Sequence, residues 1–129
     1  MYKVSIKAVL PAPDGRIVLL LNEREEWELP GGQIELGETP PECLAREIAE
    51  ELGLQVAVDA APLDSYLFEV IPGRHVFIVT YCARLVGPFE PQLSHEHRRW
   101  ALFAPQALPS NLPAGYRASI LSATKAFPT

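Results

Sequence analysis

The sequence predicts a mixed α/β (α+β) fold, in which two helices pack against a sheet of strands. Two segments, residues 40–52 and 114–127, carry apolar side chains at helical spacing, whereas most other apolar runs have the composition and alternation of strands. Several of these strands follow one another between the two helices, without the regular alternation of a doubly wound parallel sheet. At 129 residues, the chain is expected to form one domain, residues 1–129.

The first strand is predicted near the N-terminus, where Val4, Ile6 and Ala8 fall on one face. The turn residues 13–15, Pro-Asp-Gly, separate it from the aliphatic run at residues 16–22, so these two strands are expected to pair as a hairpin. A charged loop then leads to Trp27 and to Pro-Gly-Gly at residues 30–32.

The helix at residues 40–52 has both end signals. Thr39 is placed as the N-cap, Pro40 suits the first helical position, and Glu42 completes a Thr-x-x-Glu capping box. Gly53 is placed to end the helix. The predicted buried stripe of this helix consists of Leu44, Ala45, Ile48, Ala49 and Leu52.

Strands are predicted again at residues 54–58, 63–70 and 75–85, the last two joined as a hairpin by residues 71–74. The second half of residues 93–103 is also strand-like. The closing helix is expected to bury four apolar side chains: Tyr116, Ile120, Ala123 and Phe127.

Composition and charge narrow the function classes. The net charge of −5 argues against nucleic-acid polymers and acidic membranes as partners, because both attract a clustered positive field. Cys43 and Cys82 form no CxxC pair and are expected to be small core residues in a reducing, cytoplasmic setting. The alternating N-terminus reads as a strand and not as a signal sequence, and no apolar run is long enough to span a membrane.

Acidic residues are concentrated in one part of the chain, since ten of the sixteen lie between residues 23 and 51. Glu47, Glu50 and Glu51 crowd one side of the helix, and Glu51 projects only about 20° from the buried Leu44. Like charges at this spacing cost about 0.2–0.5 kcal/mol each, and Arg46 alone cannot offset three carboxylates. A solvated acidic face is the simpler alternative, but a bound divalent cation such as Mg²⁺ would resolve the conflict.

Residues 32–54 carry a longer pattern around this helix. Gly32 is followed after five residues by Glu38 and after seven more by Arg46-Glu47, then by Ile48, Glu50-Glu51, Gly53 and Leu54. This pattern resembles the signature of the Nudix hydrolases at every defined position. The order of strands and helices is also similar to that family, which implies an α/β/α sandwich.

The resemblance implies a hydrolase that cleaves a diphosphate linkage in a small nucleoside-diphosphate derivative, with Mg²⁺ or Mn²⁺ as cofactor. It implies Glu47, Glu50 and Glu51 as metal ligands, joined by the main-chain carbonyl of Gly31 or Gly32. Arg46 is expected to orient a glutamate, and Glu38 is expected to brace the loop against the helix. Homodimers are common in that family, although no stretch of this sequence predicts one.

The sequence leaves two assignments open. The general base is expected to be one of the motif glutamates, Glu50 ahead of the others, or Glu96. His95 and His97 beside Glu96 are expected either to contact phosphate or to face water. Side chains that are candidates for stacking a base or holding a phosphate are Arg24, Trp27, Tyr66, Phe68, Arg74 and His75. Nucleoside triphosphates, ADP-ribose, dinucleoside polyphosphates and nucleotide sugars all remain candidate substrates. A nucleotide-sensing module without catalysis and a calcium-binding or structural acidic helix are the rival functions.

Overall fold

The structure is a computed structural model that describes residues 2–97 and 99–126. Within those ranges, no helix is both long enough and apolar enough to cross a bilayer. The elements, in chain order, are β1 (Lys3–Val9), β2 (Ile17–Leu21), β3 (Trp27–Glu28), β4 (Gly31–Gln33), α1 (Pro40–Leu52), β5 (Val56–Val58), β6 (Asp64–Ile71), β7 (Arg74–Leu85), β8 (Arg99–Phe103) and α2 (Ala114–Ala126).

The strands form two sheets. The larger sheet has the order β4-β1-β7-β5, with β6 also paired to β7, and the smaller sheet has the order β3-β2-β8. β1 and β7 run parallel although more than sixty residues separate them, whereas β4, β5 and β6 pair antiparallel with their neighbours. The register of β1 places Lys7 between Gly31 of β4 and Thr80 of β7.

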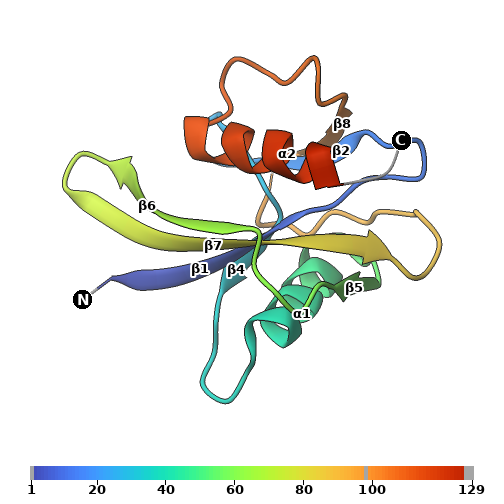
Figure 1. Ribbon diagram of the computed structural model, residues 1–129, viewed down its shortest axis with the longest axis horizontal. Helices are drawn as coiled ribbons and strands as arrows, with labels where there is room; N and C mark the ends of the chain where they lie inside the picture. Colours follow the sequence, from blue (N-terminus) through green and yellow to red (C-terminus); the bar gives the residue numbers. More distant parts are fainter. Residues whose placement is uncertain (1, 98, 127–129) are drawn as a thin grey trace.

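The two helices cover opposite faces of the larger sheet, with α1 below it and α2 above it in Figure 1. On the α1 face, Leu44 and Ile48 pack with Ile6 of β1 in one buried cluster. On the α2 face, Ile120 and Ile78 belong to a second buried cluster. The predicted mixed α/β fold with helix, sheet and helix layers is therefore confirmed.

The predicted hairpin between the first two strands is wrong beyond its turn. The turn exists, because Val18 N donates to Leu10 O at 3.0 Å and Pro11 bridges Ile17. Beyond that bridge the chain changes sheets: β1 pairs with β4 and β7, whereas β2 pairs with β3 and β8. The local turn signal was correct, but strands from distant segments occupy both edges of β1.

Helix α1 has the predicted bounds and the predicted caps. Thr39 Oγ1 accepts from Glu42 N at 3.3 Å, and Glu42 Oε1 accepts from Thr39 N at 2.9 Å, which is the reciprocal capping box. Gly53 ends the helix in the left-handed region, at φ 66°. Because the helix begins and ends at fixed residues, the direction of each glutamate on it is fixed as well.

The buried face of α1 differs from the predicted stripe. Leu44, Ile48 and Leu52 are buried as expected, but Ala49 is exposed and Cys43 is buried. Ala49 lies about 140° around the helix from Leu44, too far to share its face. The true stripe is instead shifted toward the glutamates, and it includes Glu51.

The later elements agree with the sequence. β6 and β7 form the expected hairpin, and β8 is the strand predicted in the second half of residues 93–103. In α2, Tyr116, Ile120 and Ala123 are buried as predicted, whereas Phe127 lies outside the described residues. Cys43 and Cys82 are free and buried, as expected.

Candidate metal and phosphate site

A polar cavity of about 290 Å³ lies where β4 meets α1 and the loop before β8. Five residues that the sequence analysis singled out for the metal or for catalysis line it: Gly31, Gly32, Glu47, Glu51 and Glu96. The other lining residues are Asn22, Glu23, Arg24, Glu28 and His97. The fold therefore brings the motif together with two segments outside it.

Glu51 is the most deeply buried of the motif glutamates, with 3% of the residue exposed. Its Oε1 accepts a hydrogen bond from Gly31 N at 2.9 Å, and its Oε2 lies 3.8 Å from His97 Nδ1. Burial raises the pKa of Glu51 to about 7, although Lys7 and the Gly31 amide oppose the shift. Without a cation beside it, the ionised carboxylate is therefore unfavourable in the fold.

Glu47 approaches the backbone of Gly32 so closely that any side chain at residue 32 would displace the carboxylate. A Cβ on residue 32 would lie 2.5 Å from Glu47 Cδ and 2.6 Å from both carboxylate oxygens. The Glu47 side chain is 17% exposed, and burial is the main cause that raises its pKa. Gly32, the first residue of the motif, thus leaves the space in which this carboxylate sits.

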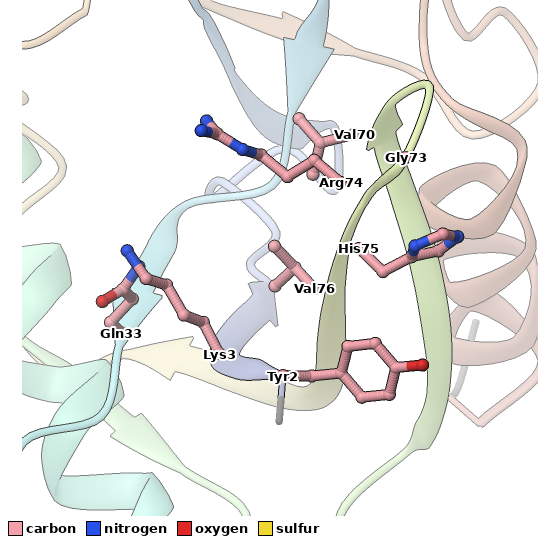
Figure 2. Close-up of a pocket in the computed structure, with 8 residues that line it drawn as sticks. All are labelled: Tyr2, Lys3, Gln33, Val70, Gly73, Arg74, His75 and Val76. Atoms are coloured by element: carbon pink, nitrogen blue, oxygen red, sulfur yellow. The ribbon is translucent and has the colours of Figure 1, made fainter.

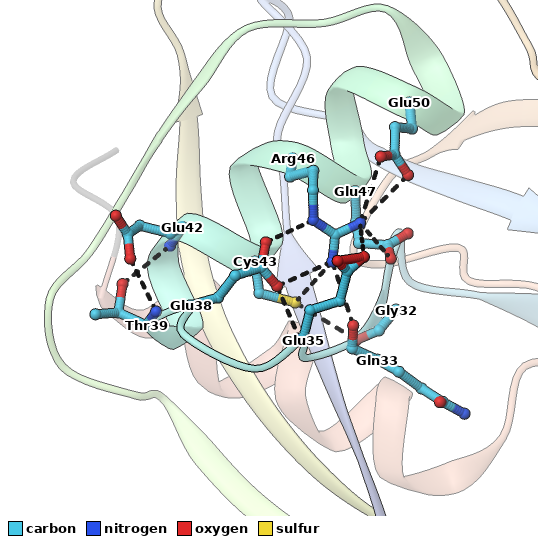
Figure 3. A network of polar contacts seen from close by, with 10 residues as sticks. All are labelled: Gly32, Gln33, Glu35, Glu38, Thr39, Glu42, Cys43, Arg46, Glu47 and Glu50. Atoms are coloured by element: carbon cyan, nitrogen blue, oxygen red, sulfur yellow. Dashed lines mark hydrogen bonds and ion pairs between the residues drawn. The ribbon is translucent and has the colours of Figure 1, made fainter.

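Arg46 ties the motif loop to the motif helix, as Figure 3 shows. Its guanidinium donates to both oxygens of Glu38, through Nε at 2.5 Å and Nη2 at 3.0 Å. Nη1 also donates to Glu47 at 3.1 Å and lies 3.3 Å from Glu50. One arginine therefore positions two of the three candidate metal ligands of α1 relative to the loop.

The two candidate bases differ in position. The Glu50 side chain is 60% exposed, faces Arg46, and is not among the residues that line the polar cavity. Glu96 is exposed too, but it lines the cavity together with Glu47 and Glu51. The two histidines beside it separate as well, because His95 is exposed and absent from the lining, whereas the His97 side chain is only 8% exposed and lines it.

Sequence reasoning did not single out Glu28, which contacts His97. His97 Nε2 lies 2.7 Å from Glu28 Oε1, and Asn22 donates to Glu28 Oε2 at 3.2 Å. Burial alone would raise the pKa of Glu28, but the charge of Lys7 and the hydrogen bonds from His97 and Asn22 lower it to about 2. The sequence signal that could have identified Glu28 is its position as a charged residue between two large apolar ones, Trp27 and Leu29, which are both buried in the fold.

Lys7 was also missed. It is 7% exposed, and it lines a second cavity, of about 130 Å³, which shares Arg24 and Glu28 with the polar cavity. The available signal was the alternation of β1, which puts Lys3, Ser5 and Lys7 on one face of a strand that is otherwise apolar.

The six candidate substrate contacts do not form one pocket. Arg24 and Phe68 line the second cavity, whereas Arg74 and His75 line a third, of about 580 Å³, at the far end of the β6–β7 hairpin (Figure 2). Trp27 is buried, with Phe103 against its ring at 5.0 Å between centroids. Tyr66 packs so closely on α2 that a Cβ on Gly115 would lie 2.4 Å from its ring.

The residues at the polar cavity fit a hard divalent cation in their chemistry, since carboxylate and main-chain carbonyl oxygens are the ligands that Mg²⁺ takes. Glu51 is a buried carboxylate without a cation in hydrogen-bond contact, and the adjacent His97 Nδ1 is buried without a hydrogen-bond partner. In the part of the chain that the structure describes, however, no three acidic, histidine or cysteine side chains already converge as a metal cluster. In particular, Glu47 and Glu50 are paired with Arg46.

Comparison with known proteins finds relatives that match about half of this chain. A Mycobacterium tuberculosis protein named putative 8-oxo-dGTP diphosphatase 2 is 68% identical over 72 residues, which is 56% of this chain and 49% of that protein. A MutT-like protein of Streptomyces ambofaciens is 43% identical over 60 residues, which is 46% of this chain and 39% of that protein. The matched part of the chain thus spans half or less of the length of these relatives.

Two solved structures share the whole architecture. The MutT protein of Methanosarcina mazei Go1 has a TM-score of 0.82 at 23% identity, over 97% of this chain and 94% of that one. The MutT NUDIX hydrolase of Burkholderia pseudomallei has a TM-score of 0.78 at 28% identity, over 95% of this chain and 98% of that one. A family model described as the NUDIX domain matches residues 1–123. The chain therefore belongs to the NUDIX family.

Proposed function

We propose that this protein hydrolyses the diphosphate linkage of a small nucleoside-diphosphate-linked substrate, with Mg²⁺ or Mn²⁺ as cofactor. The observation that carries the proposal is the buried Glu51 carboxylate, which is bonded to Gly31 and shares one polar cavity with Glu47 and Glu96. A carboxylate whose pKa is raised to about 7 by burial is costly to the fold, and a cation would remove that cost. Membership of the NUDIX family supports the same reaction class.

In this proposal, Glu47, Glu50 and Glu51 hold the metal together with the main-chain carbonyl of Gly31 or Gly32. When bound, the ion would neutralise phosphate charge and acidify a water molecule. Arg46 keeps Glu47 and Glu50 oriented through its contacts at 3.1 and 3.3 Å, and it is anchored on Glu38. Exposed Glu50 would contribute from the rim of the site.

The general base is Glu96 or Glu50. Its task is to accept the proton of the water that attacks phosphorus. The position of Glu96 on the cavity wall favours it, since Glu50 faces Arg46. Comparing the pH dependence of turnover at saturating Mg²⁺ in Glu96→Gln and Glu50→Gln separates them, because loss of the base should cost at least about 100-fold and remove the acid limb of the profile, whereas loss of a ligand alone should keep that limb. Equal small losses in both variants would exclude both residues as the base.

The names of the relatives favour a nucleoside triphosphate among the candidate substrates. Relatives from Mycobacterium tuberculosis and Proteus vulgaris are named 8-oxo-dGTP diphosphatases, and one from Escherichia coli K12 is named dihydroneopterin triphosphate diphosphatase. Each name describes a triphosphate that carries a ring system with ring carbonyls. We therefore place triphosphates ahead of ADP-ribose, dinucleoside polyphosphates and nucleotide sugars for this chain.

The proposal includes the setting of the protein. Residues 1–129 would act as one domain in the cytoplasm, where the free thiols of Cys43 and Cys82 remain reduced. The protein would bind a small molecule and neither a nucleic-acid polymer nor a membrane. Light scattering of the purified protein would show whether it forms a homodimer.

The rival function is a nucleotide-binding module without catalysis. Incubating a panel of nucleotides with the protein, with and without Mg²⁺, separates the hydrolase from the binding module. The hydrolase releases nucleoside monophosphate and inorganic diphosphate, and the binding module releases neither. Turnover that requires Mg²⁺ supports the hydrolase. Tight binding without turnover for any nucleotide, under conditions where Mg²⁺ binds, would favour the sensor. A structural acidic helix would show neither binding nor turnover.

A further inference from the structure

The second cavity is lined by Lys7, a largely buried lysine whose ammonium lies over the ring of Tyr116. Lys7 is 7% exposed, yet among residues 2–97 and 99–126 its ammonium makes no hydrogen bond or ion pair. The nearest aromatic ring belongs to Tyr116, whose centroid lies 6.0 Å from Lys7 Nζ. Buried cations are normally paired, so a lysine that faces a cavity with unused donors indicates a ligand there.

The cavity around Lys7 suits a flat heteroaromatic ring. Its walls are largely apolar and aromatic, with Phe68 and Tyr116 5.8 Å apart between ring centroids. Val70, Val76 and Ile78 complete the apolar part of the lining. Its volume of about 130 Å³ leaves room for one ring system but not for a triphosphate chain. The polar lining residues are Ser5, Lys7, Arg24 and Glu28.

This cavity adjoins the polar cavity at Arg24 and Glu28, which line both. A nucleotide whose phosphates lie beside Glu47 and Glu51 would therefore place its base next to Lys7. Lys7 stays charged, since Tyr116, Glu28 and the motif glutamates outweigh the effect of burial and raise its pKa. Glu28 stays ionised, so it offers only acceptors.

Lys7 and Glu28 together present a donor and an acceptor to the ring. The carboxylate of Glu28 already accepts from His97 and Asn22, one at each oxygen, but each oxygen has a second lone pair. A 6-oxopurine carries a carbonyl oxygen beside a ring N–H, which matches this donor and acceptor. Adenine carries an amino group beside an unprotonated ring nitrogen, which reverses both roles.

We propose that Lys7 is a specificity-determining residue that donates to a ring carbonyl, with Glu28 accepting the adjacent ring N–H, and thereby selects oxo-bases over amino-bases. This inference rests on the proposed function only for the position of the phosphates. It assigns the substrate class as nucleotides of 6-oxopurines, the chemistry that guanine and hypoxanthine share.

The test uses inosine and adenosine monophosphates, because they differ at the 6-position and the adjoining ring nitrogen. Binding to the whole protein in EDTA, measured by calorimetry, needs neither metal nor turnover, so its outcome is independent of catalysis. The wild-type protein should bind inosine monophosphate roughly 10-fold or more tighter, the difference expected when a charged donor gains a proper acceptor. Equal affinities in the wild type would overturn the proposal without any variant.

Lys7→Met removes the ammonium and should abolish the preference, while Lys7→Gln, which leaves neutral donors, should retain part of it. Lys3→Met is the matched control, since Lys3 lies on the same strand but lines the cavity at the far end of the hairpin (Figure 2). It should keep the wild-type preference. Equal weakening of both nucleotides and of inorganic diphosphate by Lys7→Gln would show a phosphate contact and overturn base selection. Failure of the hydrolase proposal would appear separately, as absent turnover with an intact inosine preference.

Discussion

Gly31 N donates to Glu51 Oε1 at 2.9 Å, so that two residues twenty positions apart, one on β4 and one on α1, are joined at a buried carboxylate. The bond satisfies one oxygen of Glu51 and leaves the charge without a cation in hydrogen-bond contact. The bond also fixes the position of Glu51, a proposed metal ligand, relative to Gly31 and Gly32. The free energy of this arrangement is therefore expected to depend on pH and on metal.

Glu51→Gln should stabilise the metal-free protein at pH 8 while abolishing turnover. Burial raises the pKa of Glu51 from an ordinary 4.5 to about 7, so ionisation costs the folded state nothing below pH 4.5 and the full amount above pH 7. Glutamine cannot ionise and still accepts from Gly31. Urea unfolding in EDTA should show a gain of up to about 3 kcal/mol at pH 8 and little change at pH 4.5. A variant less stable than wild type at pH 8 would contradict this account.

Gly32→Ala should separate activity from stability. The new methyl group would meet the Glu47 carboxylate at 2.5–2.6 Å, and the flexible end of that side chain can move away. The melting temperature should therefore change little, but turnover should fall by about 100-fold because a ligand is displaced. Gly87→Ala is the control, since its nearest neighbour is Gln55 at 3.5 Å. Unchanged turnover in Gly32→Ala would mean that the position of Glu47 does not matter.

Arg46→Lys should lower both the melting temperature and turnover. Lysine cannot reproduce the two-pronged contact with Glu38 at 2.5 and 3.0 Å while also reaching Glu47. We expect turnover to fall roughly 10- to 100-fold, as for other residues that orient metal ligands. Arg16→Lys, at the exposed pair with Asp14, is the matched control and should leave both quantities at the wild-type values.

Glu28→Gln should change the acid limb of the stability curve. The neighbours of Glu28, Lys7 foremost, hold its pKa at about 2 against an ordinary 4.5, despite the opposing effect of burial. A lowered carboxyl pKa contributes stability above about pH 4.5 that is lost as the pH falls toward 2. In EDTA, the wild type should therefore lose on the order of 1–3 kcal/mol of unfolding free energy across that window, and the variant should lose less. Parallel curves for the two proteins would show that Glu28 is not stabilised by its partners.

Several features could be predicted because their causes are local. The capping box of Thr39 and Glu42 and the stop at Gly53 fixed the bounds of α1, since caps act within one turn. The β6–β7 hairpin followed from its turn residues for the same reason. Burial of Glu51 also followed from its angle to Leu44 on the helix. These features need only the geometry of one element.

Other features depended on pairing between distant segments. The turn before β2 was evident from the sequence, but the strands that it joins enter different sheets. The parallel pairing of β1 with β7 depends on contacts between segments more than sixty residues apart, which no short pattern encodes. Ala49 was misplaced because a helical stripe has a width that only the surface packed against it determines.

The sequence by itself determined the acidic helix, its caps and the family signature, because each is written within residues 32–54. Only the tertiary structure decided that Lys7 from β1, Glu28 from β3 and His97 from the loop before β8 meet beside that helix. The physical reason is that a charge is recognised as functional by its burial and its partners, and both are properties of the packed chain.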